Sequence, residues 1–365
     1  MRLSWWIALA ALTLLAGVIT VQTKGQYCLP IFSGAGWDAW HGLDPYLLRE
    51  GRPDLFKYGP IWAIFLIPLT ALPDGLAPLI WYLINAGAFG WACLLYKRIL
   101  GSPGAGFTPL ELVLLFPLLL ANGFYGQINS LLLLLLVLSM RASPSKATGV
   151  WLGMATWMKL FPGFLILLWI KKWRESIQPL LGVLVMGMVG VVLPLLVWGP
   201  QVFESYLATL THDVNAPHHK LGLLSLLLSW EMSLESATMI QKIFAIGFFG
   251  GVFLLPARQL QLAQALAITG FLFFSHMTEP PTLALLALPV LFLSHWFRGK
   301  LWLLSPLVVF LFLLPSDLTP QLIKESLGGQ YAIKTYGILS CMLLLVYAGL
   351  LDRLRRTPGR TSSPG

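Results

Sequence analysis

The sequence predicts an all-α protein that crosses a membrane many times. The 365-residue chain is 57% hydrophobic and only 11% charged, with a mean hydropathy of +0.77, and this composition excludes an ordinary soluble globule. Apolar segments recur near residues 5–21, 59–73, 76–96, 107–121, 128–140, 147–170, 177–198, 238–256, 261–274, 282–297, 301–314 and 332–351. Several are shorter than the roughly 20 residues of a perpendicular span, so about twelve transmembrane helices are an estimate.

Residues 5–21 are expected to be a retained first helix and not a cleaved signal peptide. Arg2 precedes a long apolar run, and no clean small-x-small cleavage site follows it. Arg2 favours a cytoplasmic N-terminus, although Lys24 argues weakly for the opposite orientation. A cytoplasmic N-terminus places a large first loop, residues 22–57, on the outer face of the membrane.

Short basic clusters between the apolar segments indicate the topology. The net charge of +9 is scattered in a pattern typical of topology signals and lipid headgroups, and not of nucleic-acid binding. An alternating count places most clusters in the cytoplasm, but it places Lys97–Arg98 and Arg141 with Lys146 outside. These clusters would move inside if residues 147–170 formed a re-entrant hairpin broken at Pro162. The simple count is preferred here.

The first outer loop is the predicted site of chemistry, because it combines ionisable and aromatic side chains between two apolar segments. Its members are Trp37, Asp38, Trp40, His41, Asp44, Tyr46, Arg49, Glu50, Arg52, Asp54, Phe56, Lys57 and Tyr58. A carboxylate beside cations suits general-base catalysis on an anionic donor. The simpler alternative is that the aromatic rings anchor at the membrane interface and the charges are solvated.

The second outer loop, within residues 199–237, holds three of the six histidines in eight residues. Its polar members include His212, Asp213, His218 and Lys220. This group could bind a divalent cation or a phosphate, contact a substrate, or be plain surface polarity. The three cysteines show no metal-ligand or redox spacing.

Polar side chains also interrupt the apolar segments. Lys159 lies within residues 147–170, and because a lysine in lipid is costly, we expect it to face a polar cavity. Gln127 and Asn129 could contact substrate or hydrogen-bond neighbouring helices. Glu279 is a further candidate for substrate contact, or an ordinary exposed residue at a turn.

Several elements together resemble glycosyltransferase family 87, enzymes of the GT-C fold. They are Gly42–Tyr46, Phe56–Pro60, Ala71–Pro73, Gly126–Asn129 and Lys159–Pro162, in this order. The resemblance implies a conserved seven-helix module with a large first outer loop, residues 1–198, and a variable helical module, residues 199–351. Residues 352–365 are expected to be a disordered basic cytoplasmic tail.

The resemblance also implies an inverting transfer of a hexose or pentose, such as mannose, from a polyprenyl-phosphate donor to a lipid or glycan acceptor. No metal or other cofactor is expected. Members typically carry an acidic residue where this chain reads Gln26–Pro30. We therefore assign the general base to Asp38 first and Asp44 second, and the cationic side to Arg49, Arg52, Lys57, His218 and Lys220. Tyr46 and Tyr58 complete the predicted substrate contacts.

The resemblance places the protein in a bacterial cytoplasmic membrane, with the active site facing the periplasm or exterior. A lipid or solute transporter is the main alternative, although no internal symmetry supports it, and a structural membrane protein is a third possibility. The sequence does not select the sugar or the acceptor.

Overall fold

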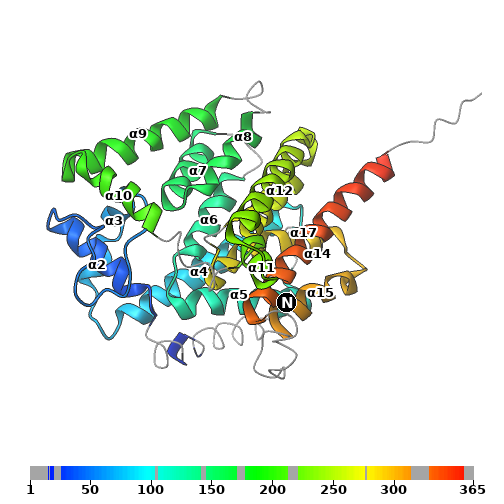
Figure 1. The fold of residues 1–365 in the computed structure, drawn as a ribbon, viewed down its shortest axis with the longest axis horizontal. Coiled ribbons are helices and arrows are strands. Elements are labelled where there is room, and N and C mark those ends of the chain that lie inside the picture. Colours follow the sequence, from blue (N-terminus) through cyan, green and yellow to red (C-terminus); the bar gives the residue numbers. More distant parts are fainter. Residues whose placement is uncertain are drawn as a thin grey trace, which may run out of the picture.

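The computed structural model describes residues 15, 17–19, 26–102, 106–140, 145–170, 177–212, 221–275, 278–313 and 329–356. These residues form helices and no strand (Figure 1). In the first half they are α2 (Leu29–Trp40), α3 (Pro60–Phe65), η1 (Ile67–Ala71), α4 (Ala77–Ile99), α5 (Pro109–Tyr125), α6 (Asn129–Ser139), α7 (Lys146–Met158), η2 (Phe161–Phe164), α8 (Leu165–Ile170) and α9 (Gln178–Trp198). The second half contains α10 (Gln201–His212), α11 (Leu223–Ser229), α12 (Leu234–Leu254), η5 (Ala257–Gln259), α13 (Leu260–Phe274), η6 (Pro280–Leu286), α14 (Ala287–Trp296), η7 (Leu301–Leu304), α15 (Ser305–Val308), η8 (Val309–Leu313) and α17 (Gly329–Arg356).

Four of the described helices are long and apolar enough to cross a membrane. They are α4, α9, α12 and residues Tyr331–Arg353 of α17. Other apolar helices are shorter, for example the 11-residue α6, which at 1.5 Å per residue extends only about 16 Å. The all-α membrane class is confirmed, while the number of crossings and the module boundary at residue 198 stay predictions. Across that boundary, α13 and α14 pack against α8, α4 and α5.

Helix α5 runs from one end of the molecule to the other, and the contacts at its two termini define these ends. It starts with a capping box between Thr108 and Glu111 and ends at Gly126, whose φ of 64° suits a glycine cap. At the Gly126 end, Trp81 Nε1 donates to the Gly126 carbonyl at 2.7 Å, and Cys28 N donates to the Tyr125 carbonyl at 2.9 Å. The first loop and the start of α4 therefore meet the C-terminal end of α5, which we call the loop end.

Residues 147–170 form a hairpin and not one crossing. Helix α7 ends at Met158, and the next residue, Lys159, has an extended backbone (φ −144°, ψ 138°). The short η2 then begins at Phe161, with Pro162 in its first turn, before α8. Gly59 N donates to the Trp157 carbonyl at 2.8 Å, which places the end of α7 at the loop end. Ile166 of α8 lies beside residues Thr148 and Leu152 of α7, so α8 runs back along α7.

Residues 59–73 also differ from the expected straight span. They break into α3 and η1, and both pack against α2. The Gln26 amide donates to the Pro78 carbonyl at 3.0 Å, so the segment returns to the loop end before α4 begins. The simple topology count, which placed Lys97–Arg98 and Lys146 on the first-loop side, is therefore wrong for these residues. Arg141 lies outside the described residues.

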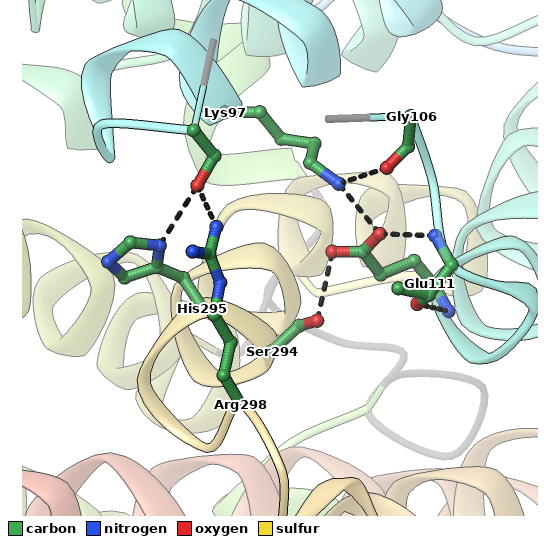
Figure 2. Close-up of polar contacts among 8 residues, drawn as sticks. Lys97, Gly106, Glu111, Ser294, His295 and Arg298 are labelled. Carbon is green, nitrogen blue, oxygen red and sulfur yellow. Dashed lines mark hydrogen bonds and ion pairs between the residues drawn. The ribbon is translucent and has the colours of Figure 1, made fainter. Parts of the chain in front are cut away.

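Lys97 lies instead at the start of α5, one length of this 17-residue helix from the loop end, or about 25 Å. Its ammonium donates to Glu111 Oε2 at 2.7 Å and to the Gly106 carbonyl at 2.9 Å. Ser294 Oγ donates to Glu111 Oε1 at 2.9 Å. Figure 2 shows this network, which ties α4, α5 and α14 together. We call this the basic end.

Other polar groups join the same end. The Ser102 hydroxyl contacts His295 Nδ1 at 3.1 Å and accepts a hydrogen bond from Arg298. Gln259 donates to Asp352 at 2.7 Å, which joins the start of α13 to the end of α17. Figure 1 shows α2, α3 and α10 grouped at one edge of the molecule, with the C-terminal part of α17 at the other. Basic residues from distant segments thus gather away from the first loop.

Candidate active site

A cavity of about 510 Å³ lies at the loop end. The first loop contributes Tyr27, Cys28, Asp54, Lys57 and Tyr58, and later segments contribute Tyr125, Gln127, Lys159, Tyr206, Glu279 and Tyr331, among others. Two lysines and two carboxylates thus share a wall with several aromatic rings. This combination can bind an anionic sugar derivative and move a proton.

Asp54 and Lys57 form an open ion pair on the loop side of the cavity. Lys57 Nζ donates to Asp54 Oδ2 at 2.8 Å, with side-chain exposures of 19% and 38%. Asp54 Oδ1 accepts from the Leu55 amide at 2.7 Å, and the Tyr27 hydroxyl donates to the Pro53 carbonyl at 3.1 Å. The turn is held by its own hydrogen bonds, while the pair remains accessible from the cavity.

Tyr58, Gln127 and Cys28 form a hydrogen-bonded row in the cavity wall. The Tyr58 hydroxyl donates to Gln127 Oε1 at 2.7 Å, and Gln127 Nε2 donates to Cys28 Sγ at 3.1 Å. Burial is the main cause that raises the pKa of Cys28 to about 12 and the pKa of Tyr58 well above its usual value. Both groups are therefore neutral near pH 7, which suits hydrogen bonding and not nucleophilic attack.

Lys159 and Glu279 approach the cavity from other segments. Lys159 lies in the turn between α7 and η2 and lines the polar cavity, as expected. The break in the helix places it there. Glu279 follows Thr278, whose carbonyl accepts from the Leu221 amide at 2.6 Å, and precedes the rigid pair Pro280 and Pro281. Direct contact of either side chain with substrate stays a prediction.

Asp38 is fully buried and is not part of the cavity wall. Its Oδ1 lies 3.0 Å from Arg49 Nε and its Oδ2 lies 2.6 Å from Arg52 Nη1. Arg52 also donates to the Gly34 carbonyl at 2.8 Å. The arrangement joins α2 to the loop that carries both arginines, and the predicted base and two predicted phosphate ligands are thereby engaged with one another.

Asp44 connects the first loop to α10. Its Oδ1 accepts from the Tyr46 amide at 2.9 Å, and its Oδ2 accepts from the Ser205 hydroxyl at 2.6 Å. The Tyr46 hydroxyl donates to the Tyr58 carbonyl at 2.6 Å. Neither Asp44 nor Tyr46 is among the cavity-lining residues, so these two predicted residues stabilise the packing of the first loop and do not line the cavity.

The remaining predicted residues are placed as follows. Asn129 is fully buried at the start of α6, away from the cavity wall, and its amide has no hydrogen-bond partner within the described part of the chain. Asp213, His218 and Lys220 lie outside the described residues, as does the side chain of His212. Within the described ranges, no three His, Cys, Asp or Glu side chains are grouped to hold a metal ion.

Several polar cavity residues were not among the predicted contacts, including Tyr27, Cys28, Tyr125, Tyr206 and Tyr331. Asp54 was part of the charged cluster but was not selected either. The signal for Asp54 was its position two residues before Phe56–Pro60, an element of the family pattern. No comparable signal marked Tyr206, which reaches the cavity only because α10 packs there.

A second, apolar cavity of about 270 Å³ adjoins the first. It lies among η2, α8, α12 and α13 and includes Phe164, Ala245 and Phe249. Both cavities are lined by Phe161, Phe271 and Ser275, and the rings of Phe161 and Phe271 stack with centroids 3.8 Å apart. We call this second cavity the apolar groove. These three residues form the boundary that it shares with the polar cavity.

The family model for glycosyltransferase family 87 matches residues 56–278, more than half of the chain. The match includes the α7–η2 turn and α13, and it starts at the cavity side of the first loop. No curated protein matches the chain. On the extent of the family match, the chain belongs to glycosyltransferase family 87.

Proposed function

We propose that this membrane glycosyltransferase transfers a sugar, mannose or a similar hexose or pentose, from a polyprenyl-phosphate donor. The acceptor is a lipid or glycan. One observation carries the proposal: a charged cavity of about 510 Å³ shares residues with an apolar groove of about 270 Å³. A lipid-linked sugar phosphate has the same division into a charged head and a hydrocarbon chain.

The proposed reaction inverts the anomeric centre. The acceptor oxygen attacks the anomeric carbon, the lipid phosphate leaves from the opposite side, and a first-loop aspartate takes the acceptor proton. Asp38 and Asp44 were predicted for that role, but Asp54 is the first-loop aspartate that lines the cavity. Lys57 and Lys159 are the cavity-lining cations among the described residues, and fixed positive charge stabilises a departing phosphate.

The distribution of basic residues supports an active site on the outer face of a bacterial cytoplasmic membrane. Lys97, Arg298 and the start of α7 at Lys146 lie at the end of the molecule opposite the first loop. Basic residues accumulate on the cytoplasmic side of membrane proteins. The cavity would then open toward the periplasm or exterior.

The test is transfer of radiolabelled sugar by purified protein in nanodiscs. Polyprenyl-phosphate-mannose, -glucose and -arabinofuranose are supplied as donors, with membrane lipid and glycan extracts as acceptors. We expect transfer from one donor class. Donor uptake into the opposite leaflet without transfer would favour the transporter alternative, and absence of transfer from every donor despite folded protein would overturn the proposal.

A further inference from the structure

We propose that the cavity binds donor and acceptor in one fixed orientation. The lipid phosphate binds at Lys159, beside the apolar groove, and the acceptor hydroxyl binds at Asp54, which makes Asp54 the general base. This inference rests on the proposed function. It assigns the two ends of one cavity to leaving group and acceptor, and it replaces Asp38 as the residue that takes the proton.

The groove end is defined by the residues common to both cavities. Phe161, Phe271 and Ser275 line both cavities, so a hydrocarbon chain in the apolar groove that carries a phosphate in the polar cavity would pass these residues. Lys159 lies two residues before Phe161, in the same turn, and also lines the polar cavity. The turn is fixed by hydrogen bonds from Lys159 N to the Ala155 carbonyl at 2.9 Å and from Gly163 N to the Leu160 carbonyl at 3.1 Å. A phosphate attached to that chain therefore emerges beside an anchored lysine.

The other end is defined by the first loop. Asp54 and Lys57 line the polar cavity, and none of the described first-loop residues, 26–57, lines the apolar groove. In an inverting displacement, the attacking oxygen and its base lie across the sugar ring from the leaving group. With the phosphate at the groove, the base belongs on the loop side. Glu279 is only four residues from the shared Ser275, which suits contact with donor sugar hydroxyls.

The proposed step is balanced within the named groups. The acceptor O–H proton moves to the Asp54 carboxylate as the acceptor oxygen forms its bond to the anomeric carbon. The bond from that carbon to the phosphate oxygen breaks, and its electron pair stays on the lipid phosphate. The Lys159 ammonium stabilises the charge that develops there, while Lys57 holds Asp54 Oδ2 at 2.8 Å and so orients the base.

Two variants separate binding from chemistry. We expect Asp54→Asn to bind undecaprenyl phosphate as the unmodified protein does, while transfer falls ~10²–10⁴-fold, as is typical for loss of a general base. We expect Lys159→Met to weaken undecaprenyl phosphate binding at least about tenfold, as for loss of one charge-assisted contact, with recovery in Lys159→Arg. Native mass spectrometry in detergent measures binding, and the nanodisc assay measures transfer.

The groove has its own matched pair. Ala245→Trp fills the groove, whereas Ile246→Trp, on the next residue of α12, changes a side chain that is 75% exposed. We expect Ala245→Trp, and not Ile246→Trp, to weaken binding of undecaprenyl phosphate. Inorganic phosphate, which lacks the hydrocarbon chain, is the control probe.

Full transfer by Asp54→Asn, or unchanged lipid binding in both Lys159→Met and Ala245→Trp, would overturn the inference while leaving the proposed function intact. Failure of the unmodified protein to transfer any sugar would instead overturn the proposed function. Lipid binding that still depends on Lys159 and Ala245 in that case would support the assigned phosphate and chain positions.

Discussion

Two lysine–carboxylate pairs of almost equal length lie at opposite ends of this molecule. Lys57–Asp54 measures 2.8 Å and Lys97–Glu111 measures 2.7 Å, but the side-chain exposures are 19% and 38% in the first pair and 9% and 6% in the second. Glu111 accepts from Thr108, Ser294 and Lys97, and Lys97 also lies 5.0 Å from the Phe107 ring centre. The two pairs differ in their surroundings and not in their length. Lys97–Glu111 is a buried clamp between helices, whereas Lys57–Asp54 is a group that substrate can reach.

The buried ion pair of Asp38 resembles the buried Lys97–Glu111 pair, although it lies near the cavity. Its carboxylate has no exposed surface and is held by two arginines at 3.0 and 2.6 Å. The comparison therefore places Asp38 and Glu111 in one structural class and Asp54 in another. Substitutions at each position test that division.

The largest loss of stability is expected from Lys97→Met. It leaves the Glu111 carboxylate buried without its cation, and breaking a buried pair in this way costs about 3–5 kcal/mol. Thermal unfolding in detergent, followed by fluorescence, measures the loss. The double variant Lys97→Met with Glu111→Leu removes both charges and should recover most of it. Equal loss in the single and double variants would contradict the clamp.

Asp38→Asn is expected to cost about 1.5–3 kcal/mol, the range for a lost charged hydrogen bond. The amide keeps the shape of the side chain but cannot neutralise both arginines. Thermal unfolding and transfer are measured on the same preparation. Unchanged stability with intact donor binding and abolished transfer would restore Asp38 as the base.

Gly59→Ala is expected to destabilise the protein by about 1–3 kcal/mol, as typical overpacking does. A Cβ atom there would lie 2.5 Å from the Trp157 carbonyl oxygen, and the backbone contact between the first loop and α7 would have to open. Gly75→Ala, where no atom lies within 4 Å of the added carbon, is the matched control in the same unfolding measurement. A similar effect of both substitutions would argue against this close contact.

Lys57→Met is expected to change unfolding stability by less than about 1 kcal/mol, because ion pairs that solvent can reach contribute little, and the Lys57 and Asp54 side chains are 19% and 38% exposed. The same lysine-to-methionine change is thus expected to cost much more stability at the basic end than at the loop end. Thermal unfolding beside Lys97→Met gives the direct comparison. A loss as large as that of Lys97→Met would show that the Asp54–Lys57 pair is also a structural clamp.

The sequence alone predicted the all-α membrane class and the family. Four of the predicted substrate contacts, Lys57, Tyr58, Gln127 and Lys159, line the cavity, and their contact with substrate stays a prediction. The membrane class could be predicted because hydropathy reports transfer into lipid residue by residue. The residues of a short motif such as Phe56–Pro60 are adjacent in the chain, so they lie close together in any tertiary structure. Local composition was sufficient in each case.

The tertiary structure decided which end of each helix faces the first loop and which carboxylate reaches the cavity. An apolar run of 24 residues at 147–170 reads alike as one crossing or as a hairpin, because both are apolar on every side. Asp38 and Asp54 are equally polar in the sequence. Only packing brings Arg49 and Arg52 around Asp38 and leaves Asp54 at the cavity, because burial and ion pairing depend on contacts between residues distant in the chain.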